Sequence, residues 1–229
     1  MTQVAKSAPK SVRTRWYDDA CGTALALDLV GERWSLLIIR ELMFGGRRFG
    51  ELKASLTGIS ANVLTQRLEW MEASGILVRR KLPPPASVQL YELTPWGYES
   101  ETAIQELGRW AVRSPDHDTS LPLSAASLMM SFRTMISAER SAGVAATVGF
   151  RFGPESFVAT LADGGIEIVR GDGDGADLVV TSDPMSLASV VYGGRPLADA
   201  ESAGVVTLSG DRALFARFAT FFPLPPKSF

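Results

Sequence analysis

Three polar side chains in the first third of the chain could contact the edges of nucleic-acid bases. Asn62, Thr65 and Gln66 recur at the spacing of one helix face. An amide side chain can pair with adenine in the major groove, and a hydroxyl can contact several bases there. Ser60 precedes them and can cap the helix, because its hydroxyl accepts a hydrogen bond from an otherwise unpaired backbone amide. The pattern is typical of a helix that reads DNA.

Two short helices joined by a tight turn are predicted to position these side chains. Residues 49–55 form the first helix, and the second begins after the turn. In the second helix Leu64, Leu68 and Met71 fall at positions i, i+4 and i+7, so they form a buried stripe opposite the polar face. A helix that is packed on one side and carries short polar groups on the other has the form of a helix-turn-helix reader.

A basic hairpin follows the helix pair. Strand-like runs at residues 76–78 and 88–93 enclose three consecutive cations, Arg79, Arg80 and Lys81. Cations beside a reading helix suit contact with phosphates, which supplies most of the sequence-independent affinity for DNA. The alternative is an ordinary solvated hairpin, since basic triplets are common on protein surfaces. The neighbouring helix pair favours the DNA interpretation, with the hairpin as a wing.

Motifs of a specific order and spacing extend over about residues 15–112. In chain order they are Cys21, the run from Leu29 to Leu42, the run from Arg47 to Leu52, Gly58-Ile59-Ser60, the run from Val63 to Leu68, and the run from Tyr91 to Thr94. Together they resemble the HxlR family, whose members are winged-helix transcription regulators of bacteria that bind operator DNA as homodimers. The resemblance implies a winged helix-turn-helix fold, double-stranded DNA as a partner, and a homodimer.

The predicted DNA-binding surface combines the reading helix, the wing and the start of the first helix. Its residues are Arg48, Ser60, Ala61, Asn62, Thr65, Gln66, Arg67, Arg79, Arg80 and Lys81. The chain departs from the family at one point in this set. The family usually has Pro-Lys after the capping serine, whereas this chain has Ala61 and Asn62. A lysine that would contact phosphate is therefore missing, and Asn62 could pair with an adenine edge instead.

Two further apolar stripes complete this half of the chain. The first consists of Trp34, Leu37, Ile38 and Leu42, and its helical spacing predicts core packing rather than a ligand site. The second consists of Ala103, Leu107, Trp110 and Ala111, on a helix predicted to begin at Pro95 after the capping residue Thr94. The second stripe could face its own domain or a symmetry mate. In the resembling family the terminal helices build the dimer, and a two-fold dimer would place two reading helices on successive major-groove turns.

The charge of the chain is unevenly distributed. A formal net charge of −2 by itself would not suggest DNA binding. Residues 1–91 hold 13 Lys and Arg against 8 Asp and Glu, a net charge of +5, whereas residues 92–229 hold 10 against 17, a net charge of −7. The basic part coincides with the predicted reader, and the acidic part would keep other surfaces off the phosphate backbone.

The length of the chain suits two domains. We predict a winged helix-turn-helix domain with an N-terminal arm over residues 1–115, a polar, proline-flanked linker over residues 116–123, and a second domain over residues 124–229. The corresponding fold class is α+β, with the winged domain followed by a layered α/β domain.

Apolar periodicity beyond the linker predicts the elements of this second domain. Helices are predicted around residues 128–136, 184–191, 196–202 and 214–222, and strands around residues 144–152, 157–161, 166–168, 176–181 and 205–208. Three short motifs in this order are Asp177 to Ser182, Gly194-Arg195-Pro196 and Leu208 to Asp211. They are similar to the sterol-carrier-protein domain, a layered α/β fold that encloses an apolar tunnel for lipids or other hydrophobic ligands. The similarity covers about residues 124–222.

The sterol-carrier resemblance suggests a site for a hydrophobic small-molecule effector. Six residues could line its pocket, namely Phe132, Met135, Phe150, Phe157, Phe215 and Phe218. The alternative is that each of them is an ordinary core residue. Likeness of fold alone does not establish that a ligand binds.

The sequence offers no arrangement of residues that favours catalysis or metal binding. The segment Gly171–Gly175 superficially resembles a calcium loop, but with Asp172 as the first ligand the fifth position is Ala176 and the twelfth is Asp183 rather than Glu. His117 is the only histidine, which excludes a multi-histidine metal site and a Ser-His-Asp arrangement. We therefore predict no enzymatic activity, no metal and no cofactor.

Cys21 is the only cysteine of the chain. A single cysteine permits no intramolecular disulfide and suits a reducing cytoplasm. In the resembling family a cysteine near the N-terminus serves some members as a redox sensor, and Arg15 or an exposed helix start would lower the pKa of the thiol. The alternative is a small packed residue.

Neither a membrane-spanning run nor a signal-peptide core occurs in the sequence. The segment Met1–Arg15 contains four cations and no acid, so it could be a basic arm on DNA or a solvated tail. We predict a cytoplasmic, homodimeric, DNA-binding transcription regulator whose C-terminal domain senses a hydrophobic small molecule. The alternative is a lipid- or metabolite-binding carrier whose winged helix serves protein contacts.

Overall fold

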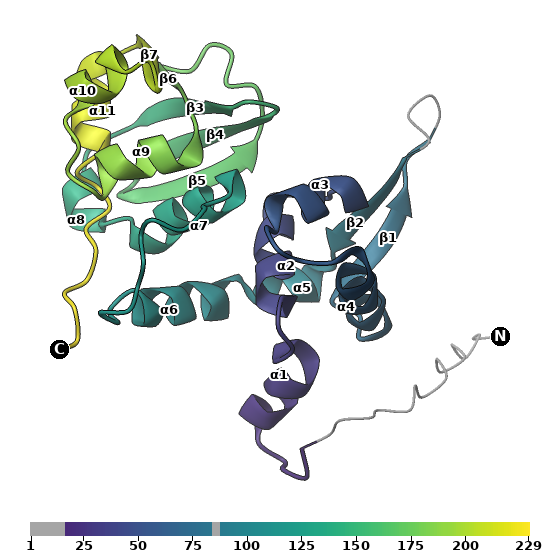
Figure 1. Ribbon diagram of the computed structural model, residues 1–229. Coiled ribbons are helices and arrows are strands. Elements are labelled where there is room, and N and C mark those ends of the chain that lie inside the picture. The colour runs from purple at the N-terminus through teal and green to yellow at the C-terminus, as the bar shows by residue number, and fades with distance from the viewer. Residues whose placement is uncertain (1–16, 84–87) are drawn as a thin grey trace.

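The chain folds into a helical N-terminal half with a two-stranded hairpin and a C-terminal half built on a five-stranded sheet (Figure 1). The computed structural model describes residues 17–83 and 88–229. The predicted basic arm, Met1–Arg15, lies outside the described residues, as do Pro84 and Pro85 of the wing. No helix within the described ranges is both long enough and apolar enough to cross a membrane.

The N-terminal half has the elements of a winged helix-turn-helix. In chain order these are α1 (Gly22–Val30), α2 (Ser35–Leu42), α3 (Phe49–Ser55), α4 (Ala61–Ala73), β1 (Leu77–Lys81), β2 (Gln89–Leu93), α5 (Pro95–Glu99) and α6 (Glu101–Ala111). The two helices predicted on either side of the tight turn are confirmed as α3 and α4. β1 and β2 pair antiparallel, which confirms the hairpin of the wing.

The single helix predicted from Pro95 is wrong, because the chain divides it into α5 and α6. Thr94 caps α5 as predicted, since its hydroxyl accepts a hydrogen bond of 3.0 Å from the amide of Gly97. At Ser100 the backbone amide and the hydroxyl both donate to the carbonyl of Gly97, at 3.3 Å and 2.7 Å. A hydroxyl bonded to a nearby carbonyl competes with the regular helical ladder. Ser100 therefore closes α5 with a tighter turn, and α6 begins at the next residue.

The apolar stripe predicted from Trp34 to Leu42 is only partly buried. Ile38 and Leu42 are fully buried, but Leu37 is 39% exposed, so its predicted place in the core is wrong. Trp34 lies just before α2 with φ of 81°, in the left-handed region that bulky side chains rarely adopt. The helix thus begins only after Trp34, with Ser35, and turns Leu37 toward the surface.

The C-terminal half is a layered α/β region around a mixed sheet. Its elements are α7 (Ala125–Met135), α8 (Ala138–Ser141), β3 (Ala146–Phe152), β4 (Glu155–Ala162), β5 (Gly165–Arg170), β6 (Leu178–Ser182), α9 (Pro184–Val191), α10 (Leu197–Ser202), β7 (Val206–Gly210) and α11 (Arg212–Phe218). The strand order is β5-β4-β3-β6-β7; β3 and β6 run parallel, and the other neighbours pair antiparallel. The order of the helices and strands predicted for this half is confirmed, and of its described elements only the short α8 has no predicted counterpart.

One face of the sheet carries the core of this half. In β4 the side chains of Phe157, Ala159 and Leu161 are buried, and the residues between them are more exposed. This alternation is typical of a strand that is covered on one face. Helices α7 and α11 contact the sheet, and α9 packs on α7 (Figure 1). The buried face of the sheet and these helices therefore enclose the apolar interior of the C-terminal half.

The six residues predicted to line a ligand pocket all lie in this interior. Phe132, Met135, Phe150, Phe157, Phe215 and Phe218 are each at most 5% exposed. The ring of Phe132 stacks on Phe222 with centroids 4.5 Å apart and meets Phe218 edge-on at 5.4 Å. Phe150 lies 5.6 Å from Phe218. This ring-to-ring packing supports the core alternative, and a ligand role for these residues stays a prediction.

The two halves pack directly on each other. Phe44 meets Phe157 edge to face with ring centroids 5.5 Å apart, and the guanidinium of Arg133 lies 4.5 Å from the centroid of Phe44. Helix α7 contacts both α2 and α6, and the buried apolar residues form one cluster that includes both halves. Residues 116–123 contain no helix or strand, while the domain boundaries themselves stay a prediction.

Candidate nucleic-acid interface

Helix α4 has a packed face and an exposed polar face. Leu64, Leu68 and Met71 are almost completely buried, which confirms the predicted stripe. Asn62, Thr65 and Gln66 are exposed, as are Ser60 and Ala61 at the start of the helix. The polar groups predicted to read bases are therefore brought together on one accessible surface, on the first two turns of α4.

Three local features fix the position of α4. The hydroxyl of Ser60 accepts a hydrogen bond of 3.2 Å from the amide of Val63, which confirms the predicted N-cap. The indole of Trp70 donates to the carbonyl of Leu29 at 3.0 Å and ties α4 to the end of α1. In the turn before α4, Gly58 has φ of 90°, a conformation that L side chains rarely adopt. The turn therefore depends on glycine at this position.

Two arginines predicted to contact DNA occupy different environments. The guanidinium of Arg67 lies 3.6 Å from a carboxylate oxygen of Glu32, and its side chain is only 19% exposed. Arg67 thus lies on the flank of α4, where it contacts the segment between α1 and α2. The side chain of Arg48 at the start of α3 is 56% exposed, and its backbone amide donates to the carboxylate of Glu51 at 2.9 Å. Of the two, Arg48 is the one accessible to a phosphate.

The three cations of the wing are divided between its two faces. Successive side chains of a strand point to opposite sides, so Arg79 and Lys81 share one face of β1 and Arg80 occupies the other. Arg79 contacts Glu72 of α4 at 2.7 Å, and Arg80 contacts Glu92 of β2 at 3.1 Å. Both ion pairs partly neutralise the wing, and the pair with Glu72 holds it against α4. Arg80 and Lys81 remain exposed and can still approach a phosphate.

Within the described residues there is no group of three or more His, Cys, Asp or Glu that could hold a metal ion. In the loop that superficially resembles a calcium site, Asp174 pairs with Arg151 at 2.6 Å. The carboxylate of Asp172 accepts a hydrogen bond of 3.1 Å from the amide of Asp174. The loop carboxylates thus serve contacts within the protein.

Cys21 is exposed and occupies the N-cap of α1, so the alternative of a packed structural cysteine is not supported. The nearby backbone amide and hydroxyl of Thr23 and the amide of Ala24, at the start of α1, lower the pKa of the Cys21 thiol below its usual value. A lower pKa increases the fraction of thiolate, which is the reactive form. The predicted effect of the helix start is thus present, while Arg15 lies outside the described residues.

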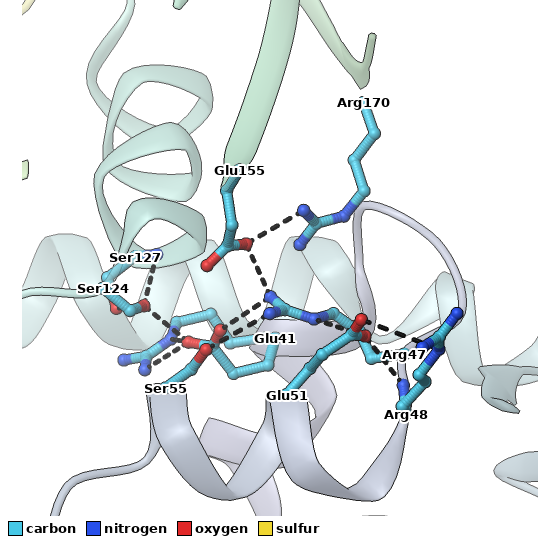
Figure 2. A network of polar contacts seen from close by, with 10 residues as sticks. Glu41, Arg47, Arg48, Glu51, Ser55, Ser124, Ser127, Glu155 and Arg170 are labelled. Atoms are coloured by element: carbon cyan, nitrogen blue, oxygen red, sulfur yellow. Dashed lines mark hydrogen bonds and ion pairs between the residues drawn. The ribbon is translucent and has the colours of Figure 1, made fainter. Parts of the chain in front are cut away.

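The sequence prediction missed a network of buried charges between the two halves, shown in Figure 2. Glu41 of α2 is fully buried, and Arg47 before α3 is 5% exposed. Glu155 of the C-terminal sheet meets Arg47 from the other side and also pairs with Arg170 (Figure 2). The one indication in the sequence is that Glu41 falls three residues after Ile38 and directly before Leu42, on the apolar stripe of its helix.

Comparison with known proteins places this architecture in a family. The model of the HxlR-like helix-turn-helix family matches residues 29–119. The HTH-type transcriptional regulator YvaP of Bacillus subtilis (strain 168) is 36% identical over 87 residues, which make up 38% of this chain and 80% of that protein. The HTH-type transcriptional regulator YodB of the same strain is 37% identical over 86 residues, 38% of this chain and 77% of YodB. The chain belongs to the HxlR-like helix-turn-helix family.

A solved structure of the reduced form of YodB from B. subtilis is also similar to this HxlR-family chain, with 33% sequence identity. The match covers 43% of this chain and 97% of the YodB chain, with a TM-score of 0.39. The family match includes α2 to α6 and the wing, and the C-terminal sheet lies beyond it. The protein is a DNA-binding transcription regulator of the HxlR type. The N-terminal half is its winged helix-turn-helix.

Proposed function

We propose that this HxlR-type regulator recognises its operator through the exposed face of α4. One observation carries this proposal. Helix α4 is capped and buries an apolar stripe on one face, while Asn62, Thr65 and Gln66 are exposed on its first two turns. Base edges in the major groove are read by such short amide and hydroxyl groups at the N-terminal end of a recognition helix. Asn62 is the adenine-pairing candidate, and the exposed Ser60 and Ala61 precede it at the start of α4.

The cations around α4 supply phosphate contacts in this proposal. Arg48, Arg80 and Lys81 are exposed and carry the electrostatic part of the affinity. Arg67 and Arg79, which pair with Glu32 and Glu72, act mainly by holding α4 and the wing in place. Positioning and base reading are thus divided between different residues.

The regulator acts as a homodimer, and α6 supplies part of the interface. The stripe of Ala103, Leu107, Trp110 and Ala111 is exposed throughout, with Leu107 at 49% and Trp110 at 72%. Leu25 and Leu27 of α1 are also exposed, at 41% and 48%. A second copy of the chain would bury this apolar surface. A two-fold dimer then sets two copies of α4 about one helical turn of DNA apart, roughly 34–36 Å.

The C-terminal half is the input module in this proposal and has a sterol-carrier-like fold. Its layered sheet and helices enclose an interior rich in phenylalanine, the kind of environment that an apolar ligand would enter. A ligand changes DNA affinity only if it binds one arrangement of the dimer better than another. Membership of the HxlR family favours this role over the alternative of a carrier whose winged helix serves protein contacts.

Cys21 is proposed as a second input. It is exposed at the start of α1, and the amide of Thr23 favours its thiolate by lowering the pKa. The resembling family includes members in which an N-terminal cysteine senses oxidants. Because α1 also carries exposed Leu25 and Leu27, oxidation at Cys21 would act on the proposed dimer surface.

Loss of the Asn62 amide should weaken operator binding selectively. We expect Asn62→Ala to cost about 1–3 kcal/mol on the operator and little on random DNA, because base contacts carry specificity. The control is Arg80→Ala, which should weaken binding to both DNAs and flatten the dependence of affinity on salt. Binding constants measured on both DNAs at several salt concentrations distinguish a base contact from a phosphate contact. Equal losses on both DNAs for Asn62→Ala would exclude a base-reading role.

Replacement of Trp110 should dissociate the dimer. Trp110→Glu places a charge in the proposed apolar interface, so sedimentation should show a monomer, and operator affinity should fall because two half-sites are no longer bound together. Leu121→Glu is the matched control, since Leu121 is also well exposed, at 62%, but lies in the linker. A dimer that persists in Trp110→Glu would contradict an interface on α6.

A hydrophobic ligand should stabilise the full chain and change its affinity for the operator. A ligand at about one hundred times its dissociation constant adds roughly 2.7 kcal/mol to the free energy of unfolding. Thermal unfolding and operator binding with fatty acids and aromatic metabolites measure both effects. Phe150→Leu should alter the ligand affinity, and Phe229→Leu, at a side chain 93% exposed, should not. The input role fails if no such compound shifts either the melting temperature or the DNA affinity.

Mild oxidation should change operator binding through Cys21. Treatment of the wild type with peroxide or diamide is expected to alter its affinity for the operator, because the exposed thiolate reacts readily. The variant Cys21→Ser should bind equally well before and after treatment. Unchanged binding by the oxidised wild type would leave Cys21 without a sensing role.

A further inference from the structure

The contact between the two halves contains an apolar part and a charged part. In the apolar part Phe44, from the segment before α3, meets Phe157 of the C-terminal sheet. Arg133 of α7 covers the ring of Phe44 and pairs with Glu101 of α6 at 2.8 Å. This part joins α7 and the sheet to the scaffold of the winged half.

The charged part centres on Arg47, whose guanidinium lies between carboxylates from both halves (Figure 2). Its Nη1 atom lies 2.7 Å from an oxygen of Glu155, the first residue of β4, and 3.7 Å from Glu41 of α2. Glu155 also contacts Arg170 of β5 at 2.9 Å. The Arg47–Glu155 pair is thus a short, charge-assisted hydrogen bond between the N-terminal half and the C-terminal sheet.

Arg47 also joins the two DNA-binding elements of the winged half. Its backbone amide donates to the carbonyl of Tyr91 in β2 at 2.9 Å, and the amide of Tyr91 donates back at 2.8 Å. Its side chain donates to the hydroxyl of Ser55 at the end of α3 at 3.4 Å and lies 3.7 Å from Glu51 of the same helix. One buried residue therefore contacts the first helix of the helix-turn-helix, the wing and the C-terminal sheet.

The charge of Glu155 can be removed without leaving the guanidinium of Arg47 unpaired. Without the carboxylate of Glu155, Arg47 keeps Glu41 and Glu51 as oppositely charged neighbours. A buried arginine left with no partner would be strongly destabilising, and these two carboxylates, each 3.7 Å away, prevent that outcome for Arg47. Arg170, the other partner of Glu155, is 27% exposed and would keep its contact with the ring of Phe157, whose centroid lies 4.7 Å from the guanidinium.

We propose that the Glu155–Arg47 ion pair is the contact through which the C-terminal sheet positions α3 and the wing for DNA binding. Arg47 is a positioning residue, since it acts through α3 and β2 and does not touch DNA itself. A displacement of β4 relative to α2 moves the carboxylate that lies closest to the guanidinium, and the guanidinium holds α3 and the wing together. The inference rests on the proposed operator binding and names the path by which the C-terminal half controls it.

The test is the variant Glu155→Gln in the full chain, which keeps the shape of the side chain and removes its charge. We expect operator affinity to fall by about 2- to 30-fold, the range produced by residues that couple distant sites. Hydrogen exchange of the amides of α3 and β2 should become faster in the absence of DNA, because the guanidinium that ties them loses its closest partner. Exchange in α4, which Arg47 does not contact, should remain unchanged.

The matched control is Glu201→Gln, which removes a carboxylate from a Glu–Arg pair elsewhere in the C-terminal half. Glu201 contacts Arg212 through two bonds of 2.7 Å, and both residues lie in helices of that half. This variant should leave operator affinity and the exchange of α3 and β2 at wild-type values. Thermal unfolding of both variants separates a loss of overall stability from the local effect.

A double-mutant cycle with Arg47→Lys completes the test. If the pair acts as one unit, the affinity losses of Glu155→Gln and Arg47→Lys are not additive. Wild-type affinity together with wild-type exchange in Glu155→Gln overturns the proposal, and so does an additive cycle. Failure of the wild-type chain to bind its operator would instead refute the proposed reading surface, and the exchange measurement would still decide the positioning role.

Discussion

A carboxylate without solvent exposure, Glu41, lies at the junction between the two halves of the molecule. Burial of a charge costs several kcal/mol unless oppositely charged groups and hydrogen bonds compensate it. One oxygen of Glu41 accepts from Arg40 at 2.8 Å and from the hydroxyl of Ser124 at 2.6 Å, and the other oxygen faces Arg47 at 3.7 Å. Because Ser124 is the N-cap of α7, the shortest hydrogen bond to this carboxylate forms only when the C-terminal half is docked.

The need to compensate the buried carboxylate of Glu41 also explains why the two halves stay docked although a linker joins them. Ser124 caps α7 by accepting from the amide of Ser127 at 3.0 Å while it donates to Glu41. The start of α7 is therefore bonded to α2, the central helix of the winged half. The end of helix α6 is held in a second way, since the ammonium of Lys227 donates hydrogen bonds to the carbonyls of Val112 and Ser114 at 3.0 Å and 2.9 Å. Chain segments on both sides of residues 116–123 are thus fixed to the opposite half.

Much of the fold follows from local patterns that are visible in the sequence. The cap at Ser60, the stripe from Leu64 to Met71 and the alternation in β4 are set by residues close together in the chain, and each was predictable. The exposed face of α4 follows from the same periodicity. The division of the wing cations between two faces was implicit in the alternation of β1, but their pairing with Glu72 and Glu92 depends on tertiary contacts.

The failures of prediction have a common physical origin. Leu37 matched a helical stripe, yet its exposure depends on where α2 begins, and a left-handed Trp34 sets that point. The Arg47–Glu155 pair joins residues 108 positions apart, so no local pattern could indicate it. Buried charges are stabilised by distant partners, and a sequence shows the charge but not the partner.

Strand β4 connects the proposed ligand region with the DNA-binding half. Phe157 and the other buried residues of β4 belong to the apolar interior, and Phe157 also meets Phe44 across the junction. The first residue of the same strand, Glu155, binds Arg47, while the guanidinium of Arg170 lies 4.7 Å from the ring of Phe157. A close-packed interior transmits displacements rather than absorbing them. A ligand that separates the side chains beneath β4 would therefore act on the apolar contact and on the ion pair together, and by reciprocity a bound operator would change the affinity of the interior for that ligand.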